Sequence, residues 1–500
     1  MQASRDPAGD VLDAIVVGSG FGGLGAALSL AERGARVVLC EALNYPGGCA
    51  STFSRDGYRF EAGATLFSGF AEGQLFQRWI TTHGLEVPLD WLEPVVELRA
   101  PLGADAEGTL AIDRHPGGLE RALAALPGAP VEDLSRFFAL QRRVADALWE
   151  VLEDESLLPP LGPTALARHA LRLARYAPLA SLVGRPLVSV LARFDLADWQ
   201  PLRLTLDALC QITVQCGVGE AEAPMALSVM DYYSRGTAHV RGGIGTLATA
   251  MAGAIESAGG EVRFSSRVRS ARREGDVWTV ETRKGTLRAR SLLMNLLPED
   301  AARVMGSSTT RLARLQRRVE SGWGAAMLYR VVRSPAGADA SPHHLQLVAD
   351  PARPLQDGNH CFVSISGEAD EGRAPAGQRT LTISTHTAIE GEGEEGTGTR
   401  IQEVQDRMRA TLALRASEWE DVVHELPGSP RTFARFTGRT RGWVGGIPRR
   451  AGLANYAQLG PLRIDRRAWL IGDTAFPGQS TLATATGGVQ TATAVLRSLR

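Results

Sequence analysis

The residues that best suggest chemistry are three glycines and one acid near the N-terminus. Residues 18–23 are Gly-Ser-Gly-Phe-Gly-Gly, so Gly18, Gly20 and Gly23 satisfy the pattern GxGxxG. In this pattern the first glycine makes a tight turn, the second lets a pyrophosphate approach the backbone, and the third packs a helix on a strand. Glu41 follows 21 residues after Gly20, where a carboxylate can accept hydrogen bonds from ribose hydroxyls. The spacing predicts a dinucleotide site.

The segments around this motif have the order that a phosphate-binding unit requires. Residues 14–17 are an apolar run that predicts a buried strand, residues 21–33 predict a helix that Gly34 ends, and residues 35–41 predict a second strand. Strand, turn, helix and strand within about 30 residues form a βαβ unit and hence a parallel sheet. The free amides and positive end of the helix then hold phosphates. The alternative is a chance glycine turn.

Further glycine loops indicate which dinucleotide binds. Residues 46–51 (PGGCAS) and 57–65 (GYRFEAGAT) follow the second strand, and Gly472-Asp473-Thr474 follows a predicted strand near the C-terminus. A nicotinamide cofactor needs no second loop here, whereas a flavin ring extends past the sheet edge and needs close backbone packing. A final helix beginning near residues 484–488 would direct its positive end at the flavin pyrimidine. The pattern predicts FAD, with plain turn glycines as the alternative.

The composition excludes several other classes. The 500 residues are 44% apolar and carry a net charge of −1, so we expect a large core and no nucleic-acid partner. The five cysteines are scattered and form no CxxC pair, which favours free thiols over disulfides or a zinc site. There is no HExxH or GxSxG motif, and the single lysine, Lys284, is not placed for a Walker loop. We expect no metal site.

The motifs resemble those of the FAD-dependent carotenoid desaturases and isomerases, a family that includes phytoene desaturases, carotenoid 3',4'-desaturases and prolycopene isomerases within the amine-oxidase-like flavoproteins. The matching segments lie between residues 15 and 494 and are VVGSGFGGLGAALSL, PGGCASTF, GYRFEAGAT, HVRGGIGTLATAM and WLIGDTAFPGQSTLATATGGVQTA. The resemblance implies an α/β fold with a Rossmann-like FAD-binding domain of the glutathione-reductase type, an antiparallel-sheet substrate domain, a helical cap insert and a long apolar tunnel ending at the flavin.

The domain boundaries follow from the motifs and from the pattern between them. We expect a discontinuous FAD-binding domain, a substrate domain and a helical cap that is a candidate for membrane contact. The FAD-binding domain comprises residues 1–75 with 241–305 and 455–500. The substrate domain comprises residues 76–118 with 306–454, and the helical cap comprises residues 119–240.

The resemblance also implies which residues contact FAD. Val268 would contact the adenine through its backbone, and Asp473 with the turn 477–479 would border the ribityl chain and the ring. Ser480 stands where the isomerase-like pattern usually has glycine. The full set is Gly18, Gly20, Phe21, Gly22, Gly23, Glu41, Gly47, Gly48, Ala50, Ser51, Gly63, Ala64, Thr65, Val268, Gly472, Asp473, Gly478, Gln479, Ser480, Thr481 and Leu482.

The implied reaction removes a hydrogen pair from a C–C bond next to a polyene: the flavin takes hydride at N5, and the delocalised cation that remains loses a proton. We do not expect a lysine-held water as in amine oxidases, because Lys284 lies in a predicted hairpin turn. Glu220 and Glu222 are the catalytic carboxylates to test first, followed by Asp231; ordinary solvated acids are the alternative. His239 is a further candidate, with a packed or surface histidine as the alternative.

We therefore expect an FAD-dependent oxidoreductase that desaturates a long polyene, most simply an acyclic carotenoid, and passes electrons to a quinone or oxygen. The alternatives are a reduced-flavin carotenoid cis-trans isomerase without net redox change, a flavin oxidoreductase acting on a non-carotenoid lipid or secondary metabolite, and a flavin-bearing protein without turnover.

Arginine-rich segments leave a membrane contact open. Residues 156–194 contain no acid and five arginines among apolar residues, which is typical either of a membrane-interface segment or of core helices with solvated arginines. Arg449 and Arg450, after Pro448, are candidates to face phosphates or membrane lipid, although they are only two of 53 arginines. The expected location is the cytoplasm, with peripheral binding to the inner face of the cell membrane as the finer possibility.

Overall fold

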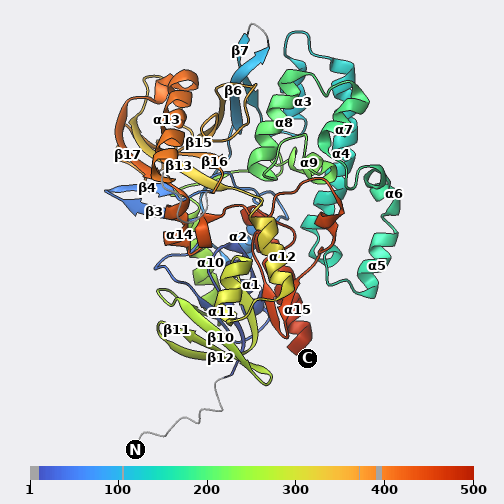
Figure 1. Cartoon of the computed structure of the whole chain (residues 1–500), viewed down its shortest axis with the longest axis vertical. Helices are drawn as coiled ribbons and strands as arrows, with labels where there is room; N and C mark the ends of the chain where they lie inside the picture. The colour runs from blue at the N-terminus through green and yellow to red at the C-terminus, as the bar shows by residue number, and fades with distance from the viewer. Residues whose placement is uncertain (1–10, 104–105, 371, 390–396, 500) are drawn as a thin grey trace, which may run out of the picture.

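The structure is a computed structural model that describes residues 11–103, 106–370, 372–389 and 397–499. Two β-sheets lie toward opposite ends of the long axis, and a group of helices covers one side of the upper half (Figure 1). This mixed α/β architecture is the fold class that the sequence predicts.

The lower sheet has eight strands and contains the predicted βαβ unit (Figure 1). Its strands β12, β1 and β2 are parallel, and β19 pairs with β12 in the same sense. Residues 14–17 are all buried, as expected for a strand covered on both faces. The strands are β1 (Leu12–Val17), β2 (Val37–Cys40), β9 (Glu261–Arg263), β10 (Val268–Glu274), β11 (Val277–Thr282), β12 (Gly285–Met294), β18 (Leu462–Asp465) and β19 (Ala468–Leu470).

Helices from the two ends of the described chain pack directly on each other beside this sheet. Helix α1 (Phe21–Glu32) crosses α15 (Thr481–Leu499), and α10 (Gly245–Ser257) lies next to α1. A Cβ atom at Gly25 would lie 2.7 Å from the Ala485 carbonyl oxygen, and one at Gly488 would overlap the Gly22 carbonyl oxygen. The two helix backbones are therefore in contact, because glycines leave no side chain between them. Helix α15 begins at Thr481, slightly earlier than predicted.

The upper sheet has seven strands in the order β17-β13-β16-β15-β14-β6-β7. The sequence predicts an antiparallel sheet, and every neighbouring pair is antiparallel except β14 and β6, which come from distant segments and are parallel. Helix α13 (Thr397–Arg415), which the sequence analysis missed, packs on β13, β14 and β15. The strands are β6 (Val96–Gly103), β7 (Ala106–Ile112), β13 (Gly324–Arg333), β14 (His343–Val348), β15 (His360–Ile365), β16 (Gln378–Thr387) and β17 (Val422–Gly428).

The helical group forms one side of the molecule, and α5 and α6 lie at its outer edge (Figure 1). Its longest helix, α4, buries residues such as Phe137, Gln141 and Val144, which recur at helical spacing. None of the described helices is both long and apolar enough to cross a membrane. The helices are α3 (Gly118–Ala124), α4 (Val131–Glu153), α5 (Pro163–Ala170), α6 (Leu173–Tyr176), α7 (Leu187–Leu191), α8 (Gln200–Thr213) and α9 (Ala223–Val229).

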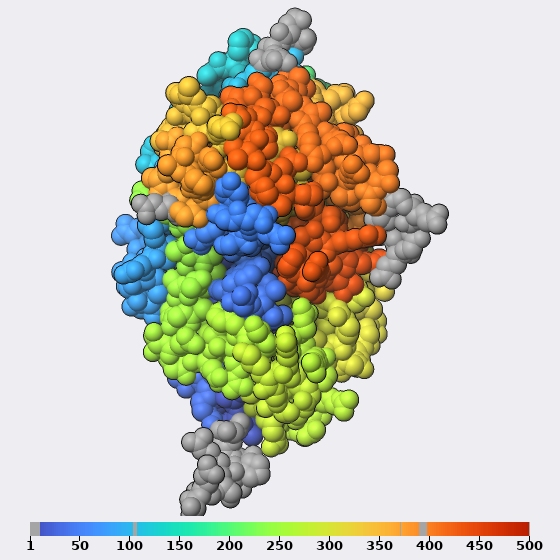
Figure 2. Space-filling model, turned by 90° about the vertical axis from the view of Figure 1, so that its left-hand side faces the viewer, coloured from blue at the N-terminus to red at the C-terminus, as the bar shows by residue number. Residues whose placement is uncertain are grey.

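Short elements connect the two halves. The hairpin of β3 and β4 lies at the surface between the orange segments of the upper sheet region and the green segments of the lower one (Figure 2). The second glycine loop precedes this hairpin, so it lies where the two halves meet. The remaining elements are β3 (Thr52–Arg55), β4 (Tyr58–Glu61), β5 (Leu89–Asp90), β8 (His239–Val240), α2 (Leu75–His83), α11 (Pro298–Met305), α12 (Thr310–Val319) and α14 (Pro430–Thr437).

Candidate active site

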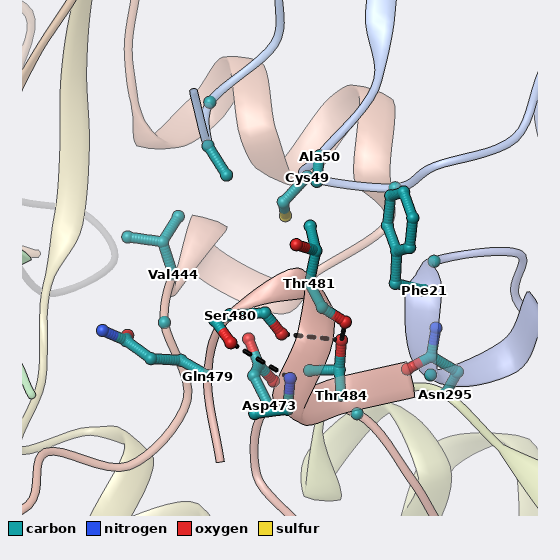
Figure 3. Close-up of a pocket in the computed structure, with 18 of the residues that line it drawn as sticks. Phe21, Cys49, Ala50, Asn295, Val444, Asp473, Gln479, Ser480, Thr481 and Thr484 are labelled. Carbon is teal, nitrogen blue, oxygen red and sulfur yellow. Dashed lines mark hydrogen bonds between the residues drawn. The ribbon is translucent and has the colours of Figure 1, made fainter. Parts of the chain in front are cut away.

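One cavity of about 600 Å³ collects residues from the start, the middle and the end of the chain. One end, which we call the loop end, is formed by three glycine loops and the beginning of α15. The three loops are residues 18–23, 46–51 and 472–474. The other, which we call the apolar end, is formed by the helical group and the upper sheet. Cys49 and Thr481 face each other across the loop end, with Asp473 and Asn295 beside them (Figure 3).

The three glycine loops pack against each other at the loop end. Gly20 and Gly47 form a parallel β-bridge, and the Gly47 amide donates to the Ser19 carbonyl at 2.9 Å. A Cβ atom at Gly22 would lie 3.0 Å from the Gly472 amide nitrogen. Side chains here would separate the loops, so the glycines leave exposed backbone as the wall of the cavity. Such a wall fits a pyrophosphate and a flat ring, which both need close backbone approach.

Glu41 is held in one orientation at the end of β2. One carboxylate oxygen accepts hydrogen bonds from the Ser19 amide at 2.8 Å and the Ser19 hydroxyl at 2.7 Å, and the other accepts from the Leu43 amide at 2.8 Å. The residue is buried and lines the cavity. The oxygen that accepts from Leu43 has a second lone pair, so the carboxylate retains acceptor capacity for a ribose.

Most of the predicted cofactor residues line this cavity, but three do not. Gly23 packs α1 against the first turn, since a Cβ atom there would overlap the Gly18 carbonyl. The Ser51 hydroxyl donates to the Gly48 carbonyl at 2.8 Å, so it supports the second loop from behind. Gly478 lies against the Arg449 guanidinium, since a Cβ atom there would come within 2.5 Å of Nη2. The predicted residues that line the cavity are Gly18, Gly20, Phe21, Gly22, Glu41, Gly47, Gly48, Ala50, Gly63, Ala64, Thr65, Val268, Gly472, Asp473, Gln479, Ser480, Thr481 and Leu482.

Ser480 occupies backbone space that favours glycine. Its φ is +95°, in the region that L residues avoid, which explains why a glycine would suit this position. Its hydroxyl accepts from the Ala483 amide at 3.1 Å and its carbonyl from the Thr484 amide at 3.0 Å. Ser480 thus caps α15 and offsets part of the strain of its backbone.

Gln479 connects the C-terminal turn to the helical group. Its side-chain oxygen accepts from the Gln215 amide group at 2.7 Å, and its nitrogen donates to the Ile212 carbonyl at 2.9 Å. The Gln215 nitrogen also donates to the Val444 carbonyl at 3.2 Å, and Figure 3 shows Gln479 extending toward Val444. The side chain predicted to border the flavin therefore also holds the end of α8 against the turn.

Two lining groups at the loop end were missed by sequence reasoning. Asn295 directly follows β12, and its side chain lies over Gly20, where a Cβ atom would come within 2.6 Å of it. A polar residue at the carboxyl end of a strand beside β1 is a signal that the sequence analysis did not use. Arg439 lies 2.8 Å from the Asp473 carboxylate, and nothing in its sequence context distinguishes it from the other arginines.

The apolar end is built from side chains of separate elements. Helices α4 and α9 contribute one wall, and strands β13, β15 and β16 contribute another. Burial lowers the pKa of His386, at the end of β16, to about 4, so this imidazole is uncharged at neutral pH. Residues that line this end are Leu148, Trp149, Val151, Leu152, Leu158, Met225, Val229, Tyr232, Ala325, Met327, Phe362, His386, Phe433 and Val444.

The predicted catalytic carboxylates lie outside the described lining of the cavity. Glu220 is exposed and pairs with Arg450 at 3.1 Å. Glu222 is buried and caps α9: it accepts from the Met225 amide at 3.1 Å, the Gly184 amide at 2.9 Å and the Tyr456 hydroxyl at 2.6 Å. Burial raises the pKa of Glu222 despite these hydrogen bonds. Both carboxylates therefore have local structural partners.

The other ionisable candidates have partners elsewhere too. Asp231 pairs with Arg235 at 2.9 Å, and His239 lies 2.7 Å from the buried Asp370 carboxylate. Lys284 lies in the predicted hairpin turn between β11 and β12, outside the described cavity lining. The carboxylates that do line the cavity, Glu41, Asp300 and Asp473, all have hydrogen-bond or ion-pair partners.

Comparison with known proteins agrees with this geometry. Residues 21–305, more than half of the chain, match the family described as flavin containing amine oxidoreductase. The chain belongs to this family and is a flavin-dependent oxidoreductase. The flavin cofactor of this chain is FAD.

Three known proteins that are similar to this chain are described below: two by sequence and one by structure. Prolycopene isomerase of Arabidopsis thaliana is 26% identical over 98% of this chain and 83% of its own. Phytoene desaturase (neurosporene-forming) of Cereibacter sphaeroides is 26% identical over 53% of this chain and 48% of its own. A solved structure of a putrescine oxidase double mutant superposes with a TM-score of 0.64 at 15% identity, covering 98% of this chain and 99% of that one, and shows the shared fold.

Proposed function

We propose that this chain desaturates a long polyene, an acyclic carotenoid, with FAD as the hydride acceptor. The observation that carries the proposal is the apolar end of the cavity, which continues directly from the loop end where the cofactor cradle lies. The similarity to a phytoene desaturase and a prolycopene isomerase supports a carotenoid as the substrate.

The three loops supply the groups that would hold FAD. Glu41 would accept from the ribose hydroxyls and Val268 would contact the adenine. Residues 18–22 would hold the pyrophosphate, while residues 47–50 and 472–482 would enclose the ribityl chain and the ring. When bound, the flavin supplies a two-electron acceptor that takes hydride. The fit rests on the loop glycines, whose missing side chains leave room for the cofactor.

The side chains of the apolar end would align the polyene and exclude water. Leucines of α4, Met225 and Val229 of α9, and Met327 of β13 present hydrocarbon to the space. The uncharged His386 adds no net charge there at neutral pH. Holding the reacting bond against the ring is the main contribution such a site can make, because orientation removes much of the entropic barrier.

A second candidate is isomerisation without net redox change. It is favoured by a specific observation: no carboxylate lines the apolar end among the described residues, so no carboxylate there can accept the proton that desaturation releases. The prolycopene isomerase also matches nearly the whole of this chain. A third candidate, another lipid or secondary metabolite, fits the same apolar lining.

The mass of the product distinguishes these candidates. Purified, FAD-loaded protein is incubated with acyclic carotenoids in liposomes, either with a soluble quinone under anaerobic conditions or with oxygen. Loss of two hydrogens in one of these arms supports the desaturase and identifies the electron acceptor. Unchanged mass with altered chromatographic retention supports the isomerase. Absence of any product from the polyenes contradicts both and leaves the non-carotenoid substrate.

We also propose that α5 and α6 contact the inner face of the cell membrane. Leu166, Leu171 and Leu173 are 55%, 86% and 67% exposed and lie among arginines. Arg172 and Arg175 pair with Glu150 of α4, a helix that also lines the cavity. An apolar surface with a basic rim suits an anionic lipid headgroup region. A polyene dissolved in the membrane would then enter close to α4.

Vesicle binding tests this contact. The double variant L171E/L173E should lose cosedimentation with anionic phosphatidylglycerol vesicles, because two carboxylates replace the apolar contact and repel the lipid charge. Leu414, 55% exposed on α13, gives the matched control L414E, which should still bind. Equal binding of wild type and both variants would contradict the proposal.

A further inference from the structure

Arg449 is held rigidly between the helical group and the C-terminal turn. Its amide donates to the Val214 carbonyl at 3.0 Å, and its carbonyl accepts from the Glu222 amide at 2.9 Å. Its guanidinium Nη2 donates to the Pro477 carbonyl at 3.1 Å, and the side chain lines the cavity. Backbone and side chain are both fixed, so the charge occupies one place.

This charge has no ion-pair partner among the described residues, in contrast with its neighbours. Arg450 pairs with Glu220 at 3.1 Å, and Arg439 lies 2.8 Å from Asp473, another carboxylate that lines the cavity. Burial, together with Arg318, lowers the pKa of Arg449 to about 10 although attraction to Asp473 acts in the opposite direction, so the side chain remains protonated at neutral pH. An unpaired cation that is largely withdrawn from water is costly, and a ligand that brings negative charge would relieve that cost.

The position of Arg449 indicates where the negative charge should be. A Cβ atom at Gly478 would lie 2.5 Å from the Arg449 Nη2, so the guanidinium lies on the turn that leads into α15. Residues 481–484, the first turn of α15, line the same cavity. The N-terminal end of a helix carries a partial positive charge. Two sources of positive potential therefore meet at the loop end, beside the proposed position of the flavin ring.

We propose that Arg449 stabilises the negative charge of the reduced flavin and so raises its midpoint potential. Hydride brings two electrons and one proton to a neutral oxidised ring, so the reduced ring carries one negative charge until a second proton binds. A fixed cation that needs no reorganisation stabilises such a charge effectively. The inference rests on the binding of FAD and not on the identity of the substrate, so it can fail or hold independently of the carotenoid assay.

The potential can be measured without any polyene. FAD-loaded R449Q, R449K and the control R450Q are reduced anaerobically beside a reference dye. R449Q should shift the equilibrium at least about tenfold toward oxidised flavin, about 30 mV for two electrons. R449K, which keeps the charge, should recover most of the shift. R450Q should match wild type, because Arg450 is already paired at the surface.

A purely structural role would give a different result. If R449Q retains FAD and the melting temperature of wild type but has an unchanged potential, the proposal is overturned. If R449Q does not retain FAD, the test uses the wild-type protein instead. The pH dependence of its midpoint potential gives the number of protons taken up with two electrons. Uptake of one proton per two electrons near neutral pH means that the reduced ring is anionic and supports the proposal, whereas uptake of two protons overturns it.

Discussion

The two ends of the cavity are built in opposite ways. At the loop end the wall is mainly backbone, brought close by glycines of three loops that touch each other. At the apolar end the wall is side chains from helices and strands that are distant in sequence. Backbone contacts suit a cofactor that is always the same molecule, whereas side chains can be exchanged without disturbing the fold. The comparison teaches that cofactor and substrate specificity can vary independently in this architecture.

The largest effect on FAD binding at the loop end is expected from the substitution E41R. It replaces the carboxylate fixed by Ser19 and Leu43 with a cation, where the ribose hydroxyls need an acceptor. FAD binding should weaken at least about 100-fold, equivalent to about 2.8 kcal/mol, and the purified protein should be colourless. Absorbance at 450 nm against protein concentration measures this. A fully yellow E41R protein would contradict the assignment of Glu41.

The next test concerns the contact between α1 and α15. G488A should separate the helices, because its Cβ atom overlaps the Gly22 carbonyl; overpacking of this kind costs about 1–3 kcal/mol. G253A is the matched control in α10, where a Cβ atom meets nothing within 4 Å and alanine should stabilise the helix by up to about 1 kcal/mol. Thermal unfolding should show opposite shifts in melting temperature. Equal shifts would mean that the helix crossing is not the tight contact described.

The smallest effect should come from filling the apolar end. V229W places a bulky ring in the cavity wall at the end of α9. Polyene turnover should fall about tenfold, equivalent to about 1.4 kcal/mol, while FAD content and the flavin spectrum stay as in wild type. V422W, at an exposed position at the start of β17, should leave both unchanged. A loss of FAD in V229W would show that the two ends are not independent.

The difference between the backbone wall of the loop end and the side-chain wall of the apolar end also explains what could be predicted from the sequence. The GxGxxG loop, Glu41 and the Gly472 turn have characteristic local spacing, and the structure brings these residues to one cavity. The apolar end has no such signal, because Val229 and Met327 resemble ordinary core residues until the elements pack.

Two further differences have local causes. The sequence predicts Glu222 as a catalytic carboxylate in a loop, whereas the structure places it at the start of α9, outside the described cavity lining; Pro224 two residues later is typical of such a helix start. The parallel pairing of β14 with β6 could not be inferred, because it joins segments separated by more than 240 residues that carry no matching motif.

The crossing of α1 with α15 has a consequence for synthesis. The wall that α1 presents is completed by residues 481–499, which are synthesised long after α1. The nascent chain can form the early βαβ unit before the helix that packs on α1 has been made. Stable loading of the yellow cofactor should therefore wait until α15 has been synthesised and has packed on α1, and the glycine face of α1 stays uncovered until then.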